Sequence, residues 1–214
     1  MLEKTMKKIN EIEKGECHLD NGNAKLFTPI KELRTDNCDF DKNYLYEMYP
    51  PLSDYKIDQY VQYYKHSFPE ELKHLYRYTN GIRLFDRYIS VAGIEPPNTP
   101  WPNHGGRSYT PIQLVDTWGN APRDQKHYGD GRLFFAWYDT YHQPQKFVYM
   151  DCTDSSLKKP VHLCYKGSEE VIESWESFDE WFSCEYEKYL QKYNNKDYQV
   201  VSFGNEIVKK IYFD

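Results

Sequence analysis

The common core-forming side chains are scarce in this sequence, since Leu, Ile, Val and Phe together account for 45 of its 214 residues. That share is just above the level at which a strongly charged chain is expected to stay disordered. Tyrosine makes up for the shortage, because the chain has 21 Tyr and 5 Trp residues. Such side chains bury large areas and keep a polar group. We therefore expect a folded protein whose core and surface are rich in aromatic residues.

Long apolar runs are also lacking. The longest one covers Leu133–Tyr138, whereas a membrane-spanning helix needs roughly 20 apolar residues. The first ten residues, MLEKTMKKIN, are charged throughout and contain no apolar segment of the kind that a secretory signal has. These absences predict a cytoplasmic protein that does not enter a membrane.

Cysteine motifs and phosphate-binding motifs are missing as well. The five Cys residues are odd in number, far apart and without a C-x-x-C pair, which argues against a disulfide framework and a zinc ribbon. The nearest metal-ligand groups are Cys17-His18 with Cys38, and His162-x-Cys164 with Cys152, and neither offers two paired ligands. No glycine-rich phosphate loop is present. We expect no metal, no cofactor and no catalytic residue.

The charge is negative and unevenly distributed. A formal net charge of −6 argues against a nucleic-acid-binding protein, which needs a positive field. Between Gly167 and Glu187 there is no basic residue. The acidic residues of that segment are Glu169, Glu170, Glu173, Glu176, Asp179, Glu180, Glu185 and Glu187. Two interpretations stay open: a face that steers a basic partner, or a solvated face that keeps the protein soluble.

We divide the chain into three parts. Residues 1–50 form an N-terminal extension, residues 51–195 the main domain and residues 196–214 a C-terminal tail. The extension opens with Leu2, Met6 and Ile9 at helical spacing, which predicts a short amphipathic helix. Its remaining residues resemble an arm laid over the main domain, which begins at the Pro50-Pro51 break.

The main domain is predicted to begin with two helices. Ser53 and Asp54 are suited to start the first. The second begins near Pro69, because proline in the first turn leaves no amide unsatisfied. It ends at Asn80-Gly81, since glycine adopts the left-handed conformation common at helix ends.

Strands follow, and then a further helix. Short strand-like runs, separated by turn residues, favour an antiparallel meander; they cover 82–85, 88–94, 132–138, 146–151, 161–165 and 171–175. Ser177–Glu180 is a capping box that starts an aromatic-faced helix, with the acidic residues Asp179, Glu180, Glu185 and Glu187 left for solvent or a partner. The fold class is α+β, with helices packed against an antiparallel sheet.

Two motifs in this order resemble the SUKH superfamily. The first is Phe68-Pro69-Glu70-Glu71-Leu72 followed by Tyr76-x-x-x-Asn80-Gly81, and the second is Ser177-Phe178-Asp179-Glu180-Trp181-Phe182 after the meander. The resemblance covers roughly residues 53–190. The sequence departs from it at Phe68, where the family has Leu, and in the proline-rich loop 95–111 and the N-terminal extension, which have no family counterpart.

The resemblance implies a SUKH-like fold and a binding protein that is not an enzyme. Bacterial members typically neutralise a toxin encoded beside them, and many such toxins are nucleases with basic grooves. We therefore expect a cognate basic toxin as the partner, with no nucleic acid and no membrane bound. We place the contact surface at Glu169, Glu170, Glu173, Glu176, Asp179, Glu180 and the loop residue Trp101. The oligomeric state is left open.

Two other functions are compatible with this sequence. The yeast members of the superfamily regulate cell-wall synthesis, so a regulatory or scaffold protein is the first alternative. The second is a carbohydrate-binding protein, because aromatic clefts suit sugars. In that interpretation Trp101 and Trp137 stack on a sugar ring, while Asp139 and Asp151 flank two strands.

Overall fold

The computed structural model describes most of the main domain and parts of its flanks. The described residues are 2–10, 16–20, 24–28, 45–64, 69–85, 88–94, 131–138, 144–153, 157–168, 170–195, 198–203 and 206–211. The proline-rich loop 95–111 lies outside them.

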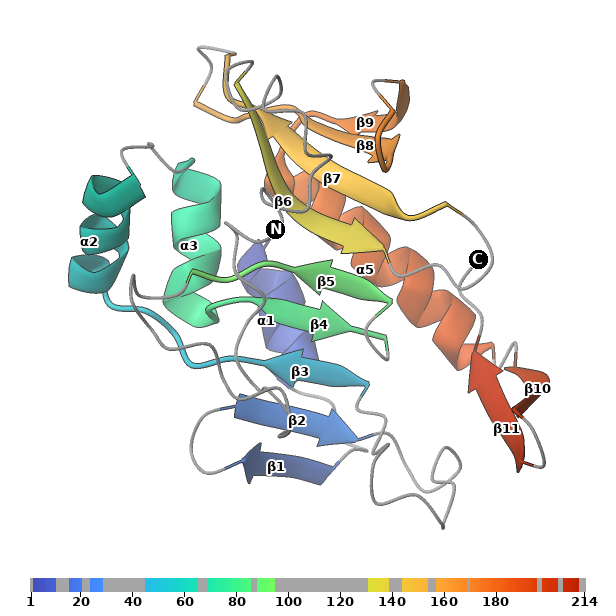
Figure 1. The fold of residues 1–214 in the computed structure, drawn as a ribbon. Coiled ribbons are helices and arrows are strands. Elements are labelled where there is room, and N and C mark those ends of the chain that lie inside the picture. The colour runs from blue at the N-terminus through green and yellow to red at the C-terminus, as the bar shows by residue number, and fades with distance from the viewer. Residues whose placement is uncertain are drawn as a thin grey trace.

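A nine-stranded sheet runs through the molecule, and every strand pairs antiparallel with the next one in the chain (Figure 1). The predicted meander is therefore confirmed. The strands are β1 Glu16–Asp20, β2 Ala24–Thr28, β3 Tyr46–Met48, β4 Ile82–Leu84, β5 Ile89–Val91, β6 Arg132–Tyr138, β7 Lys146–Asp151, β8 Val161–Tyr165 and β9 Val171–Trp175. The last four have the predicted bounds, whereas β4 and β5 are shorter than predicted.

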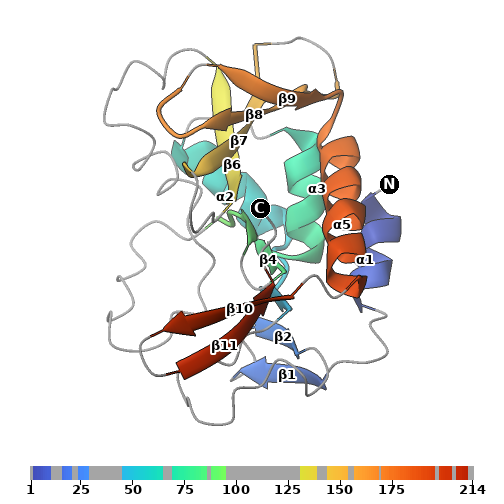
Figure 2. The same ribbon diagram turned by 90° about the vertical axis from the view of Figure 1, so that its right-hand side faces the viewer.

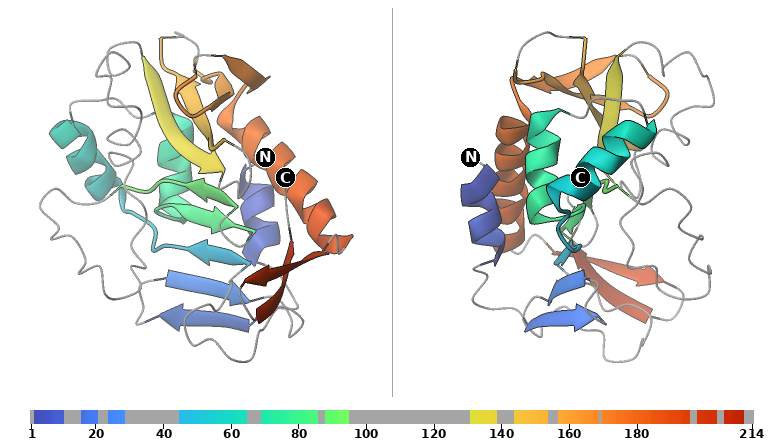
Figure 3. Two further views of the ribbon diagram at one scale, coloured as in Figure 1. Left: turned by 45° about the vertical axis from the view of Figure 1, so that its right-hand side comes forward. Right: turned by 90° about the vertical axis from the view of Figure 1, so that its left-hand side faces the viewer.

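Three helices cover one face of this sheet. They are α1 Leu2–Asn10, α3 Glu70–Tyr78 and α5 Phe178–Asn194, which lie side by side in Figure 2. Helix α2, Asp54–Tyr64, lies beyond the ends of the central strands, and the hairpin β10 Tyr198–Phe203 with β11 Glu206–Ile211 follows α5 (Figure 3). The fold is α+β, as predicted.

Aromatic rings fill the space between the helices and the sheet. Helix α5 buries Phe178, Trp181, Phe182, Tyr186 and Tyr189. The rings of Phe135 from β6 and Trp181 are nearly perpendicular, with an interplanar angle of 86° and ring centroids 5.1 Å apart, a favoured geometry for aromatic pairs. The tyrosines thus occupy positions that leucine and valine hold in most cores, which explains the composition.

The predicted extension contributes to the same core. Leu2, Met6 and Ile9 of α1 are buried, and Lys8 forms an ion pair with Glu187 of α5. Strand β3 lies between β2 and β4 in the sheet. Residues upstream of Pro50 therefore supply both a helix and sheet strands to the fold.

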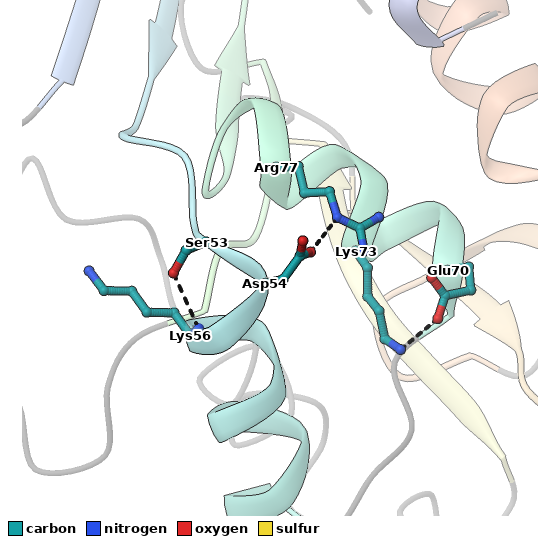
Figure 4. A network of polar contacts seen from close by, with 6 residues as sticks. All are labelled: Ser53, Asp54, Lys56, Glu70, Lys73 and Arg77. Carbon is teal, nitrogen blue, oxygen red and sulfur yellow. Dashed lines mark hydrogen bonds and ion pairs between the residues drawn. The ribbon is translucent and has the colours of Figure 1, made fainter.

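Helices α2 and α3 are joined by surface polar contacts (Figure 4). The Asp54 carboxylate of α2 accepts a hydrogen bond from Arg77 of α3 at 2.6 Å. Ser53 Oγ accepts one from the Lys56 amide at 3.4 Å, which is the predicted start of α2. Exposed ion pairs contribute little to the free energy of unfolding. We therefore expect these contacts to hold the ends of α2 and α3 in position more than to stabilise the fold.

The end of α3 differs from the prediction in one respect. The helix stops at Tyr78, and Gly81 has a φ of 97° in the turn that follows. Asn80 is buried there, its side chain donating to the Ile94 carbonyl at 2.7 Å and accepting from the Ile94 amide at 2.6 Å. Asn80 therefore ties the end of α3 to the segment after β5, which is a second role beyond ending the helix.

Candidate partner-binding surface

The structure divides the predicted acidic surface into three groups. Glu170, Glu173 and Glu176 are exposed along β9 and its flanks, whereas Asp179 and Glu180 are half-buried in the first turn of α5. Glu169 and Trp101 lie outside the described residues.

Two acidic residues of α5 do not belong to this surface. Glu185 is only 4% exposed and accepts a hydrogen bond from Tyr138 at 2.7 Å, with Lys188 at 3.1 Å. Glu187 pairs with Lys8. The expectation that both are left for solvent or a partner is wrong for Glu185, which the aromatic core covers, whereas 43% of the Glu187 side chain stays exposed beside Lys8 of α1.

The start of α5 uses Glu180 for capping. Ser177 Oγ accepts a hydrogen bond from the Glu180 amide at 3.2 Å, and the Glu180 carboxylate accepts one from the Glu176 amide at 2.8 Å. The capping box is thus present, although Glu180 reaches the residue before the cap. One of its carboxylate oxygens is therefore engaged in holding the junction between β9 and α5.

Asp179 faces a polar cluster at the start of α3. The Glu71 carboxylate there accepts a hydrogen bond from the Lys159 amide at 3.2 Å. Burial raises the pKa of Glu71 and the negative charge of Asp179 raises it further, while the hydrogen bond from the Lys159 amide and, to a smaller extent, the charge of Lys158 oppose the shift. The two segments that carry the resemblance therefore meet in space, which gives both a structural role.

Strand β9 forms the end of the sheet and is exposed over four of its five residues. Val171 and Ile172 are each 42% exposed, and Tyr165 of β8 is 36% exposed beside them. The hairpin between β8 and β9 turns through Gly167, whose φ is 77°. Exposed apolar side chains next to carboxylates are the composition expected of an interaction surface.

Glu173 lies on the side of the sheet that faces α5. Glu173 pairs in register with the buried Leu163, so its side chain leaves the sheet on the face that packs against the helix. Partial burial raises the pKa of the Cys184 thiol in α5, and Glu180, Glu185 and Glu173 raise it further. These charges thus act together around Cys184. We name the surface formed by Tyr165, Glu170, Val171, Ile172, Glu173 and Glu176 the β9 surface.

Sites for other chemistry receive little support. Burial raises the pKa of Cys164 to about 11, and His162 Nδ1 lies 2.8 Å from Ser174 Oγ, so neither resembles an activated catalytic group. Within the described ranges, no three His, Cys, Asp or Glu residues gather where they could hold a metal ion.

The carbohydrate interpretation is wrong for Trp137, which is only 6% exposed and does not offer its ring to a sugar. Asp151 accepts a hydrogen bond from the Thr153 amide at 2.9 Å, as an ordinary turn residue does. Asp139 lies outside the described residues, as Trp101 does.

None of the helices in the described part of the chain combines the length and the apolar character that crossing a membrane requires.

The exposure of the β9 surface was not predictable residue by residue. Sequence reasoning identified its carboxylates from their clustering, but missed Tyr165, Val171 and Ile172, which have the composition of a buried strand. The signal that was available is the place of β9 in the chain. In a meander each strand pairs with the next one, so the strand just before the final helix has a neighbour on one side only and forms an edge.

Comparison with known proteins agrees with the motifs. No curated protein and no solved structure matches the chain. The family model of the SMI1/KNR4 family (SUKH-1) matches residues 51–184, a span that contains both motifs and strands β4–β9. The SUKH family includes immunity proteins and SMI1/KNR4 regulators, and its members are generally not enzymes. With more than half of its length matched, the chain belongs to the SMI1/KNR4 (SUKH-1) family.

Proposed function

We propose that this protein is a bacterial immunity protein that binds a cognate toxin and blocks the toxin's basic active-site groove, as a nuclease would present. It acts by binding alone and performs no catalysis. The observation that carries the proposal is the β9 surface, where three exposed carboxylates flank the exposed apolar side chains of Val171 and Ile172 along the chain.

The charges and the apolar side chains have separate tasks in this mechanism. Glu170, Glu173 and Glu176 attract a basic groove over several ångströms and raise the association rate. Val171 and Ile172 lose water in the complex and slow its dissociation. The family also includes cell-wall-synthesis regulators, for which the partner would be a protein of the cell's own synthesis machinery.

Charge reversal tests the proposal. The variant with Glu170→Lys, Glu173→Lys and Glu176→Lys should associate with a catalytically inactivated form of the toxin encoded beside its gene about 10-fold to 100-fold more slowly than the wild type. Stopped-flow fluorescence at several salt concentrations measures this rate. The slowing should diminish as salt screens the charges.

A matched control keeps the net charge change the same. Glu3→Lys, Asp58→Lys and Glu70→Lys reverse three exposed acidic residues on the helices, and this variant should associate nearly as fast as the wild type. Absence of both binding and inhibition of that toxin by the wild-type protein would overturn the proposed function. Equal slowing in both variants would show that overall charge, and not the β9 surface, governs association.

A further inference from the structure

The outer edge of β9 is the most unusual part of the β9 surface, and the following inference rests on the proposed function. In the described sheet, β9 pairs with β8 on one side and with no strand on the other. We propose that the partner places a basic extended segment along this edge and adds a tenth strand to the sheet. Backbone hydrogen bonds supply the contact in this mode, and side chains supply the specificity.

The register identifies which backbone groups face outward. The Asp151 amide donates to the Pro160 carbonyl at 3.0 Å, and the Lys166 amide donates to the Gln145 carbonyl at 2.7 Å. Hydrogen-bonded pairs alternate along an antiparallel ladder, so these two bonds direct the backbone of Val161 and Leu163 toward β9.

The same alternation fixes the orientation of β9. Val161 pairs with Trp175, Leu163 pairs with Glu173, and His162 lies opposite Ser174. The backbone of Glu173 and Trp175 therefore bonds to β8, and the amide and carbonyl of Ser174 point away from the sheet. Ser174 is exposed, so an added strand would reach these two groups.

The negative charges beside the edge of β9 determine what kind of strand can pair with it. A second copy of this chain would bring Glu170, Glu173 and Glu176 against the same carboxylates, and like charges on neighbouring strands are destabilising. Lysine or arginine on the incoming strand would form opposite-charge pairs instead. A basic segment therefore fits the edge, and a second copy does not.

Natural sheet edges are protected by charged side chains, proline or a bulge. Residues Val171–Trp175 contain no lysine and no proline, and their charge, at Glu173, is of the sign that a basic strand would complement. The register shift between Leu163 and Cys164 makes Ile172 the extra residue of a bulge in β9, so the bulge is confined to the beginning of the strand. The segment around Ser174 stays regular and is open to pairing.

Replacing the outward amide tests this proposal. Ser174→Pro removes that amide without removing a bond to β8, a position at which edge strands tolerate proline. We expect its Kd for the inactivated toxin encoded beside the gene to rise at least 10-fold. Ser174→Ala is the matched control, because it removes only the hydroxyl near His162, and its Kd should change less than 3-fold. Calorimetric titration measures both values, and circular dichroism checks the fold.

Amide hydrogen exchange of the wild-type protein gives a second test that needs no variant. We expect the Ser174 amide to exchange rapidly in the free protein and at least 100-fold more slowly in the complex, as resolved by NMR. If the proline variant fails to fold, this measurement decides alone.

The outcomes separate the two proposals. A complex in which Ser174 exchanges as fast as in the free protein would overturn strand addition and leave the proposed function in place. Absence of any complex would overturn the proposed function. Protection of Ser174 without the toxin, together with a dimer in analytical ultracentrifugation, would show that a second copy occupies the edge.

Discussion

Tyr138 illustrates what single tyrosines do in this core. Its hydroxyl accepts a hydrogen bond from Trp181 Nε1 at 3.1 Å and donates one to the buried Glu185 carboxylate at 2.7 Å. Leucine or valine in its place would leave the Trp181 and Glu185 groups without this partner, and unpaired buried polar groups are costly. The polar end of the tyrosine side chain therefore makes an aromatic core compatible with a buried acid.

Asn80 permits a prediction at the residue scale. Asn80→Ala removes the partner of both the Ile94 amide and the Ile94 carbonyl. Each buried backbone group left without a bond costs about 1–3 kcal/mol, so the free energy of unfolding should fall by at least that amount. Urea denaturation measures the change. The exposed Asn194→Ala serves as the control and should alter stability by less than about 0.5 kcal/mol; an equal loss in both variants would contradict the role of Asn80.

At the scale of elements, helix α1 shows that the fold extends beyond the matched family span. The match begins at residue 51, yet α1 buries Leu2, Met6 and Ile9. Thr5 Oγ1 of α1 also lies 3.2 Å from Ser183 Oγ of α5. The helix layer over the sheet is thus completed by residues that precede the family span.

This packing predicts that α1 unfolds together with the main domain. Ile9→Ala should lower the free energy of unfolding by about 2–5 kcal/mol, because it leaves a cavity at a fully buried site. Lys4→Ala, at an exposed site of the same helix, should change stability by less than about 0.5 kcal/mol. Urea denaturation followed by tryptophan fluorescence checks both. If Ile9→Ala left the transition unchanged, α1 would be an independent appendage.

At the scale of the whole molecule, the aromatic core couples stability to alkaline pH. Burial raises the pKa of Tyr46, Tyr76 and Tyr138, and neighbouring groups, chiefly Tyr186 for Tyr46 and Glu185 for Tyr138, raise it further. An unfolded tyrosine ionises near pH 10. Because the folded pKa is the higher one, the stabilisation is complete below pH 10 and is lost as the pH rises above it.

The free energy of unfolding should therefore fall above pH 10 by up to about 1.4 kcal/mol per pH unit for each buried tyrosine. Urea denaturation between pH 8 and pH 11 measures the slope. Tyr76→Phe should lower this slope by up to about 1.4 kcal/mol per pH unit, because it removes one buried hydroxyl that ionises in the unfolded chain. Tyr55→Phe should leave the slope unchanged, because Tyr55 is 71% exposed in the folded protein. The same slope in the Tyr76→Phe variant and the wild type would contradict this assignment.

Local patterns were sufficient for much of the fold. Residues 132–175 alternate strand runs with turn residues, and the four strands have the bounds that the pattern predicts. Ser177 and Glu180 identified the start of α5, because a capping box depends on neighbours only three or four residues apart. The short strands β1–β3 were not predicted, since a three-residue strand such as Tyr46–Met48 carries too few residues to show a period of two.

The candidate surface depended on contacts between distant segments. The sequence by itself determined that acidic residues gather between Gly167 and Glu187 and that aromatic side chains must build the core. Tertiary structure decided what each of those acidic residues contacts: Glu185 is buried against Tyr138 and Glu187 pairs with Lys8 at the surface, whereas Glu170, Glu173 and Glu176 are exposed along β9 and its flanks. It also made β9 the edge of the sheet. The physical reason is that burial and strand order result from packing between residues far apart in the chain, which local periodicity does not encode.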